Sequence, residues 1–289
     1  MEFCHIAPTS YLNLVSERRH HLTLAHILYD EIQTSGPKKA GYKGQNKEAR
    51  YTNFYKRRMN LNIMDNGAFE LYKSGEPMFP AELLVQMAES VNANYIVLPD
   101  HPAHPSMVGI DEAMRYAPLF KEAGFGTFFV PQSDIGDLED LITSFAWGAS
   151  SPFIDYIGIS ILAVPNAYDC EKGNTLQRFN SRWKFMNELR GRGLLEMAYS
   201  NGKKIHMLGL VDGPNEIALL KDFHIDTWDS SAAIWCGLNG IGFDKSPTGL
   251  VDGKFEKPVD FDHEGADDDG IALAMANMNY IDVLSEGVA

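Results

Sequence analysis

Residues 94–132 read NYIVLPDHPAHPSMVGIDEAMRYAPLFKEAGFGTFFVPQ, and they show the pattern on which the fold rests. Short runs rich in β-branched and aromatic residues begin and end this stretch, at 94–99 and 126–131, and each is typical of a buried strand. The amphipathic residues 110–122 between them are typical of a helix. Continuously apolar strands that alternate with helices indicate a parallel sheet covered on both faces, so this stretch predicts a strand–helix–strand unit.

The same alternation extends along the whole chain. The apolar runs that we predict to be strands are 1–7, 60–64, 94–99, 126–131, 155–161, 204–210 and 225–229. The amphipathic stretches that we predict to be helices are 22–32, 80–91, 110–122, 137–145, 175–189, 214–223 and 271–284. This pattern predicts one α/β domain over residues 1–289, a (β/α)₈ TIM-type barrel with one strand hidden. A doubly wound open sheet is the alternative, although no glycine-rich dinucleotide or phosphate-binding fingerprint occurs.

Composition narrows the class of protein. The 289 residues are 45% hydrophobic and 22% charged, as is usual for a soluble globular enzyme-sized protein. No apolar run of about 18 residues and no secretion leader is visible, so we expect no membrane contact. Cys4, Cys170 and Cys236 are too few and too far apart for a disulfide framework or a paired-cysteine zinc site, so we expect a reducing, cytoplasmic location.

Charge is distributed unevenly. The net charge of −14 argues against a protein that coats nucleic acid indiscriminately. Residues 34–59, however, are a predicted insertion on the barrel rim, and within them 38–58 holds eight basic residues against one acid, a charge of +7. Cations interleaved with aromatic residues are typical of phosphate contact and base stacking, although a solvated surface loop is the simpler interpretation. The predicted nucleic-acid-binding residues are Lys38, Lys39, Lys43, Lys47, Arg50, Lys56, Arg57 and Arg58, together with Arg18 and Arg19. The acidic stretch 253–269 is predicted to connect to the last helix.

Polar residues recur where the predicted strands end. Asp65, Asp100, Gln132, Ser160 and Asp229 each stand at the carboxyl end of an apolar run. Asp65 precedes an Asn-Gly pair, which is the strongest short-range signal for a hairpin turn. A turn former explains one carboxylate after one strand, but it does not explain three carboxylates and an amide after four strands. In a barrel these ends meet on the face that carries the active site, so we predict that these residues are functional.

Carboxylates at a barrel mouth suit the chemistry of glycosidic bonds. One carboxylate attacks the anomeric carbon, and another handles the proton of the leaving or entering group. Asp100 and Gln132 offer the acceptors and donors that the N–H edge of a nucleobase needs. Phe69 and Met207 are placed to hold the ring between them. This combination indicates cleavage or exchange of a nucleobase.

Histidines give weaker signals. His101 and His104 lie on a proline-rich loop, which lacks the one-face geometry that a helix gives to metal ligands, so we expect no metal site there. His206 lies inside an apolar run, and we expect a hydrogen-bonded core residue. Asp226 is expected to be a backbone-capping partner rather than a second nucleophile.

With these residues in view, a resemblance to a known family appears. The segment HMLGLVDGPNEIALLKDFHIDTWDSSAA (206–233) resembles the tRNA-guanine transglycosylases, in which a strand ending Asp-x-x-Asp carries the nucleophile. The resemblance implies that Asp229 is the nucleophile and that Asp65, in DNGAF, is the general acid/base. It implies that Asp100 and Gln132 recognise the base. The further residues implied to bind the base are Phe69, Ser160, Ile161, Leu162, Met207 and Gly209, the strand ISILAV (159–164) resembling the family's glycine-containing strand.

The chain also departs from that family. The tRNA enzymes carry a structural zinc held by clustered cysteines and a histidine, and this sequence has no such cluster. A shorter, zinc-less barrel looks like the phage 7-deazaguanine DNA transglycosylases (the DpdA family). That resemblance implies a pentosyltransferase that exchanges guanine in DNA for a free 7-deazaguanine, such as 7-cyano-7-deazaguanine, through a covalent Asp-glycosyl intermediate and without metal or cofactor. Exchange in tRNA, a barrel hydrolase and a non-catalytic nucleic-acid-binding barrel are the alternatives.

Overall fold

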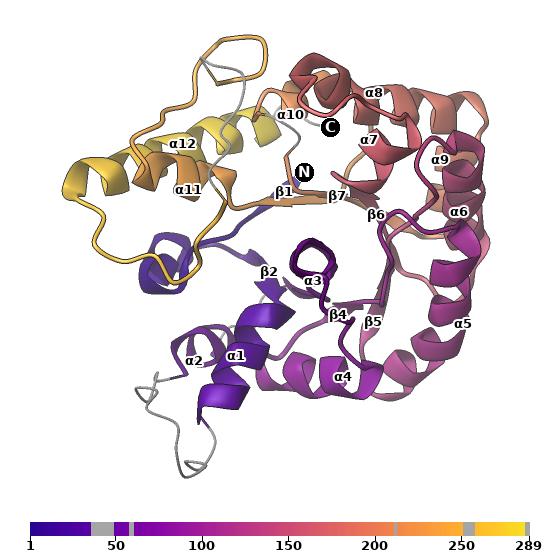
Figure 1. Ribbon diagram of the computed structural model, residues 1–289, viewed down its shortest axis with the longest axis horizontal. Helices are drawn as coiled ribbons and strands as arrows, with labels where there is room; N and C mark the ends of the chain where they lie inside the picture. Colours follow the sequence, from indigo (N-terminus) through magenta and orange to yellow (C-terminus); the bar gives the residue numbers. More distant parts are fainter. Residues whose placement is uncertain (36–48, 58–60, 211–212, 251–257, 287–289) are drawn as a thin grey trace.

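Eight parallel strands form a nearly closed barrel in the computed structural model, which describes residues 1–35, 49–57, 61–210, 213–250 and 258–286 (Figure 1). Their order in the sheet is β1-β8-β7-β6-β5-β4-β3-β2, and β1 and β2 adjoin at the seam. The strands are β1 Glu2–His5, β2 His20–Leu24, β3 Leu61–Asp65, β4 Tyr95–Val97, β5 Gly126–Phe129, β6 Tyr156–Ser160, β7 Lys204–Leu208 and β8 Thr227–Ser230. The predicted (β/α)₈ barrel is confirmed, and the open-sheet alternative is wrong.

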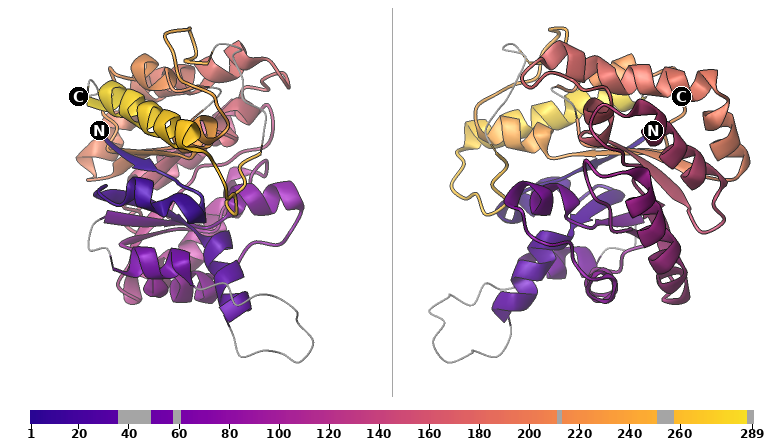
Figure 2. Two further views of the ribbon diagram at one scale, coloured as in Figure 1. Left: turned by 90° about the vertical axis from the view of Figure 1, so that its left-hand side faces the viewer. Right: turned by 45° about the vertical axis from the view of Figure 1, so that its right-hand side comes forward.

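Helices surround the strands, as the side views in Figure 2 also show. They are η1 Thr9–Val15, α1 Ala25–Ser35, α2 Arg50–Lys56, α3 Ala68–Ser74, α4 Ala81–Ser90, α5 Ser106–Glu122, α6 Leu138–Ser150, α7 Ala163–Ala167, α8 Thr175–Gly191, α9 Leu194–Ser200, α10 Glu216–Leu219, α11 Ala232–Leu238 and α12 Asp268–Glu286. The predicted helix 214–223 is shorter than expected, since α10 makes a single turn. Within the described part of the chain, no helix is long and apolar enough to cross a membrane.

Strand β2 is the eighth strand, which the sequence pattern did not reveal. A helix was predicted from Leu22, but His20–Leu24 pairs in parallel with β3, with Leu22 opposite Ile63. Helix α1 begins at Ala25, directly after the strand ends, with no turn residue between them. The apolar residues of the strand therefore merged with those of the helix into one helical pattern, and only pairing with β3 separates the two.

Helix α2 lies within the predicted basic insertion, and it is part of the packed protein. Tyr51 and Tyr55 are fully buried. The Leu24 backbone N–H donates to the Tyr51 hydroxyl at 3.0 Å, and the Tyr55 ring meets the His21 ring edge-on at 5.4 Å between centroids. Glu31 of α1 accepts hydrogen bonds from the first backbone N–H groups of α2. These two tyrosines therefore pack against β2 and are not surface platforms for bases.

The interior of the barrel is closed by aromatic rings. Tyr95 and Tyr156 meet at 4.8 Å between ring centroids, Phe128 lies 5.6 Å from Tyr156, and His206 lies 5.2 Å from Phe128. Gly126 leaves the space that the Tyr95 ring occupies, because a Cβ there would lie 2.2 Å from that ring. The barrel is thus a packed core rather than a pore, and a cavity opens above it at the carboxyl ends of the strands.

The predicted acidic connector 253–269 is described from residue 258 onward. There the Phe261 ring packs at a tilt against the His26 ring, with a centroid separation of 5.4 Å, and the Phe261 carbonyl accepts a hydrogen bond from the Thr9 N–H at 2.9 Å. The Tyr11 hydroxyl accepts a hydrogen bond from the Ala266 N–H at 2.6 Å. This part of the chain therefore packs against η1 and α1 before α12 runs along α11 (Figure 1).

Candidate active site

A cavity of about 1080 Å³ lies at the carboxyl ends of the strands. Its lining brings together residues that are up to 255 positions apart in sequence, from Ile6 to Phe261. Of the ten residues predicted to be catalytic or base-binding, nine line this cavity: Asp65, Phe69, Asp100, Gln132, Ser160, Ile161, Leu162, Gly209 and Asp229. The predicted convergence of polar strand ends on one face is therefore confirmed as geometry.

Met207 is the tenth residue, and it faces away from the cavity. It is fully buried and lies opposite Trp228 in the β7–β8 register. Its neighbours His206 and Leu208 point into the barrel, where His206 meets Phe128 and Leu208 lines the cavity. Since side chains alternate along a strand, an assignment that is one residue out of register places a side chain on the wrong face. Leu208 thus has the position that the sequence reading gave to Met207.

Asp65 takes part in a turn and also lines the cavity. Its Oδ2 accepts a hydrogen bond from the Gly67 N–H at 2.8 Å, and Gly67 adopts a left-handed φ of 77° at the start of α3. The chain continues into a helix rather than back along a hairpin, so the hairpin interpretation is wrong. Burial raises the pKa of Asp65 well above its usual value, the negative charge of Glu70 adds to this, and the Gly67 hydrogen bond opposes it.

Glu70 is a cavity residue that the sequence analysis missed. It lies in the first turn of α3 and faces the same cavity as Asp65. Burial raises the pKa of Glu70 to about 7, against the opposing charge of Lys73. His26 also lines the cavity, with Nδ1 3.6 Å from Oε2 of Glu70, and burial lowers the pKa of His26 to about 4. The cavity therefore holds two carboxyl groups with raised pKa values, Asp65 and Glu70.

Asp100 and Gln132 form a hydrogen-bonded pair with a fixed orientation. Asn66 Nδ2 donates to Asp100 Oδ1 at 2.7 Å, and Gln132 Nε2 donates to Asp100 Oδ2 at 2.6 Å. Asn66 is itself anchored, because Nδ2 also donates to the Leu98 carbonyl at 2.7 Å. Burial raises the pKa of Asp100 to about 6, and the two side-chain hydrogen bonds limit the rise.

This pair keeps acceptors for a ligand. Each carboxylate oxygen of Asp100 has further acceptor capacity beyond its one side-chain donor. The Gln132 Oε1 is buried and has no hydrogen-bond partner among the described residues. The pair can therefore accept hydrogen bonds from an N–H edge. Asn66 was missed as an orienting residue, since its only sequence signal was the Asn-Gly pair that indicated a turn.

Ser160 begins a tight connection from β6 into α7. Its Oγ accepts hydrogen bonds from Leu162 N at 3.0 Å and Ala163 N at 3.2 Å. The Leu162 N–H is therefore already engaged within the protein. Ile161 packs against Gly209, where an added Cβ would come within 3.0 Å of the Ile161 side chain and where φ is +64°. This contact closes the cavity between β6 and β7.

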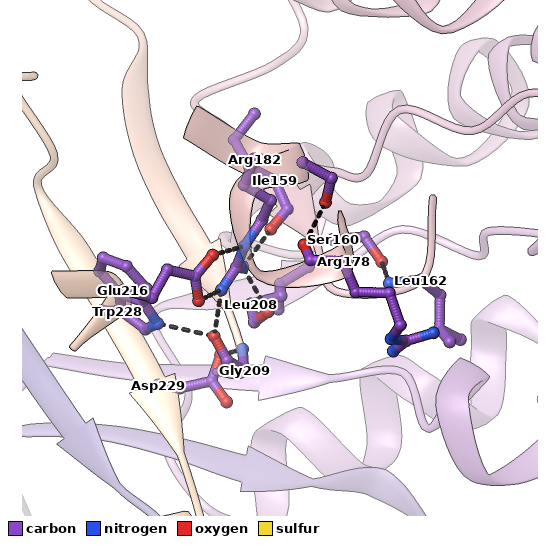
Figure 3. Close-up of polar contacts among 11 residues, drawn as sticks. Ile159, Ser160, Leu162, Arg178, Arg182, Leu208, Gly209, Glu216, Trp228 and Asp229 are labelled. Atoms are coloured by element: carbon purple, nitrogen blue, oxygen red, sulfur yellow. Dashed lines mark hydrogen bonds and ion pairs between the residues drawn. The ribbon is translucent and has the colours of Figure 1, made fainter. Parts of the chain in front are cut away.

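Asp229 is held by one of its two oxygens. Its Oδ1 lies 2.9 Å from His206 Nε2 and accepts a hydrogen bond from Gly209 N at 3.2 Å. The Gly209 carbonyl accepts hydrogen bonds from Trp228 Nε1 at 2.7 Å and from Arg182 at 2.8 Å (Figure 3). The side chain of Asp229 is almost fully buried but lines the cavity. This arrangement leaves Oδ2 as the oxygen that is available to react.

Arg182 and Glu216 form a buried ion pair behind Asp229. Both side chains are fully buried, and the pair is bidentate, at 2.7 and 2.5 Å. Arg182 also donates to the carbonyls of Ile159, at 2.9 Å, and Leu208, at 2.8 Å (Figure 3). It therefore joins the ends of β6 and β7 to the Gly209 peptide. Sequence reasoning missed this residue because a lone arginine in an amphipathic helix is usually solvated.

Cations at the cavity are not those that the sequence singled out. Lys38, Lys39, Lys43, Lys47 and Arg58 lie outside the described residues. Arg50, Lys56 and Arg57 are exposed on or beside α2, Arg19 is exposed, and Arg18 pairs with Asp282 at 2.7 Å. None of these five described residues lines the cavity.

The end of α2 lies on the opposite side from the cavity. The Lys56 carbonyl accepts a hydrogen bond from Asn92 at 2.7 Å, and Asn92 lies in the turn that leads into the amino end of β4. The cations that do line the cavity are Lys73 of α3, Lys172 in the loop before α8, and Arg178 of α8. Lys73 lies over the Phe69 ring at 3.7 Å from its centroid.

No known family model matches this chain. No curated protein matches its sequence either. Among solved structures, it is similar to a mutant tryptophan synthase alpha-subunit from Pyrococcus furiosus, with 13% identity, a TM-score of 0.42, and coverage of 78% of this chain and 81% of that one. It is also similar to phosphoribosyl anthranilate isomerase from Thermus thermophilus, with 9% identity, a TM-score of 0.39, and coverage of 97% and 98%. These likenesses concern the fold alone.

The described ranges contain no candidate metal site. No group of three or more His, Cys, Asp or Glu side chains there is arranged to hold a metal ion. The chemistry that the cavity offers on its own residues is that of a carboxylate nucleophile, carboxyl groups that carry protons, and an acceptor pair for an N–H edge.

Proposed function

We propose that this protein is a base-exchange transglycosylase that replaces guanine in DNA with a 7-deazaguanine, such as 7-cyano-7-deazaguanine. The observation that carries the proposal is that Asp229, Asp65 and the Asp100–Gln132 pair line one cavity. A nucleophile, a proton carrier and a base-edge reader are the three groups that such an exchange needs. The residues that the sequence resemblance implies for these roles are the same ones.

The first half-reaction breaks the bond between deoxyribose and guanine. A guanosine that has left the stack, at a cost of a few kcal/mol, enters the cavity, and Asp100 and Gln132 accept hydrogen bonds from its N–H edge. Asp229 Oδ2 attacks C1′, and the electrons of the C1′–N9 bond leave with the guanine. Asp65, whose pKa is raised by burial and by the neighbouring charge of Glu70, acts as the acid and gives a proton to the departing base. A glycosyl ester on Asp229 remains.

The second half-reaction reverses the first with a different base. The 7-deazaguanine takes the same place, its N9–H proton passes to Asp65, and N9 attacks C1′. The ester bond breaks and Asp229 is regenerated as a carboxylate. Because C1′ is inverted twice, the β-anomer is retained, and protons and electrons balance without an oxidant or a reductant.

The size of the cavity supports a substrate larger than a free base. Its volume of about 1080 Å³ is at the upper limit of the range of about 300–1,000 Å³ usual for small-molecule pockets. Lys172 and Arg178 stand at its edge, where the phosphates on either side of a flipped nucleotide would lie. Carboxyl groups line its interior, so a phosphate is disfavoured there and a neutral base is not.

The test is incorporation of a labelled 7-deazaguanine into DNA, followed by mass analysis of the nucleosides. The wild-type protein should incorporate the label and release guanine, and Asp229→Ala should abolish both. The matched control is Asp226→Asn, at the residue that directly precedes β8. Asp226 Oδ2 accepts a hydrogen bond from Ile205 N at 2.8 Å, outside the cavity, so this variant should keep its activity.

Three outcomes would oppose the proposal. Normal incorporation by Asp229→Ala would show that Asp229 is not the nucleophile. Label that enters tRNA but not DNA, in parallel reactions, would assign the exchange to tRNA. Release of guanine without any requirement for a second base would indicate a hydrolase.

A further inference from the structure

His206 lies in a closed hydrogen-bonded row that ends on the nucleophile. Its Nε2 is 2.9 Å from Asp229 Oδ1, and its Nδ1 is 2.7 Å from Thr227 Oγ1. His206 is fully buried in the barrel interior, and Thr227 is only 3% exposed. Two strands, β7 and β8, therefore supply this row.

The direction of each hydrogen bond follows from the number of protons available. The Asp229 carboxylate can only accept hydrogen bonds, so the proton between it and His206 belongs to Nε2. The Thr227 hydroxyl has one proton of its own, and His206 Nδ1 lies within hydrogen-bond distance to accept it. With Nδ1 as an acceptor, the ring carries its proton on Nε2 and donates it to Asp229. If the His206 ring were cationic, both of its nitrogens would be donors, and the Thr227 hydroxyl could no longer donate its proton to Nδ1.

We infer that His206 is a positioning residue, held as the neutral Nε2–H tautomer, which fixes Asp229 Oδ1 and so makes Oδ2 the attacking atom. The Gly209 N–H also donates to Asp229 Oδ1, at 3.2 Å. The hydrogen bonds from His206 and Gly209 are therefore both made to Oδ1, and neither involves Oδ2. A neutral donor orients the carboxylate and leaves its negative charge in place, whereas a cationic partner would weaken the nucleophile. The attack rests on the proposed function, but the tautomer does not.

The tautomer can be read directly by ¹⁵N NMR of the full-length protein with labelled histidine, using His206→Gln to assign the signal. We expect Nε2 to show a protonated, pyrrole-type shift and Nδ1 to show an unprotonated, pyridine-type shift at neutral pH. Two protonated nitrogens, or the proton on Nδ1, would overturn the inference. This readout needs no substrate, so it stands even if base exchange is not found.

Kinetics test the positioning role. His206→Phe removes the donor and should lower kcat for exchange about 10- to 100-fold, the usual weight of one hydrogen bond to a charged group. The KM for the free base should stay unchanged, because Asp100 and Gln132 bind it. His206→Gln can offer an amide N–H in the place of Nε2–H, so it should recover most of kcat. The matched control is His21→Gln, at a buried histidine of β2 that does not line the cavity, and it should behave as wild type.

A milder variant covers the case in which His206→Phe does not fold. Thr227→Val keeps the ring but removes the hydroxyl that fixes Nδ1. It should give a second tautomer in the NMR spectrum together with a partial loss of kcat. Equal loss in the Phe and Gln variants, with KM raised in both, would show that His206 only supports the fold. If the wild-type protein exchanges no base while the NMR result holds, the proposed function fails and the assignment of the tautomer stands.

Discussion

Asp65 shows how one carboxyl group serves both local structure and chemistry. Its hydrogen bond with Gly67 forms the turn into α3, and this bond favours the charged form of the carboxyl. Burial and the charge of Glu70 favour the neutral form more strongly, and they raise its pKa. The group is therefore costly to the fold when it is ionised, and such a cost is common where a site is built for function rather than stability.

Asp65→Asn should consequently make the protein more stable while it lowers base exchange. Because the folded-state pKa is raised, wild-type stability increases as pH falls from the folded pKa toward the unfolded value near 3.8, and it is lowest above the folded pKa. The asparagine variant has no such dependence. Thermal melts at pH 8 should show a higher Tm for the variant, by about 2–4 °C for each kcal/mol recovered.

The stability gain should disappear at about pH 3, below the unfolded value of 3.8, where the wild-type carboxyl is largely protonated in both the folded and the unfolded protein. A Tm at pH 8 equal to or below that of the wild type would show that Asp65 is not a strained buried carboxyl. The asparagine keeps an oxygen that can accept the Gly67 hydrogen bond, so a loss of the turn is not expected to mask the effect.

Among the secondary-structure elements, the Arg182–Glu216 pair is what links the site to the outer layer. Arg182 on α8 reaches the ends of β6 and β7, and Glu216 belongs to the short helix α10. Arg182 also holds the Gly209 carbonyl, whose own N–H donates to Asp229. A shift of α8 against the barrel would therefore be transmitted to the nucleophile through one peptide group.

Arg182→Ala should cost about 3–5 kcal/mol of unfolding free energy, because it removes the cation that neutralises the buried Glu216 carboxylate. Replacing both residues, as Arg182→Met with Glu216→Leu, should be less damaging than the single change. Urea unfolding of the wild type, Arg182→Met, Glu216→Leu and the double variant measures the coupling. A matched control is Arg192→Ala. Arg192 directly follows α8 and forms an exposed ion pair with Glu139, so its loss should leave the free energy of unfolding unchanged within error.

The result that would contradict this account is a single Arg182→Ala variant as stable as the wild type. It would mean that Glu216 is solvated or protonated after the change, so that the buried pair does not hold β6 and β7 together.

Considered as a whole, the protein is an acidic molecule with a few cations beside its cavity. The net charge is −14, yet Lys73, Lys172 and Arg178 line the mouth, next to a cavity that holds Asp65, Glu70, Asp100 and Asp229. The described cations at the end of α2, Lys56 and Arg57, lie toward the amino ends of the strands. Under the proposed function, we expect the polynucleotide to run across the mouth, where its phosphates can contact Lys73, Lys172 and Arg178.

The double variant Lys172→Gln/Arg178→Gln should bind DNA more weakly than the wild type, whereas Lys56→Gln/Arg57→Gln should bind as the wild type does. Each phosphate contact that is lost should reduce the slope of log K against log salt by about 0.9. Fluorescence anisotropy with a labelled oligonucleotide at several salt concentrations gives both quantities. Equal losses in the two variants, or a loss only in the α2 variant, would place the polymer elsewhere on the molecule.

Much of the candidate site can be predicted from the sequence because of a simple rule of parallel barrels. Asp65, Asp100, Gln132 and Asp229 were recognised because each ends an apolar run, and the carboxyl ends of parallel strands meet on one face whatever the details of packing. The rule needs only the type and order of the elements. It does not need exact bounds, and so it tolerated the missed strand β2.

Other features depend on positions that local pattern does not carry. Whether Met207 or Leu208 lines the cavity depends on a shift of one residue, because strand side chains alternate between two faces. The roles of Arg182 and His206 depend on partners 34 and 23 residues away, and burial turns an ordinary arginine and histidine into fixed parts of the site. The amino-acid order thus established the barrel and the polar face at its carboxyl end. The packed structure established which oxygen of Asp229 is held and which is free, because that depends on distances between strands and not on neighbours in the chain.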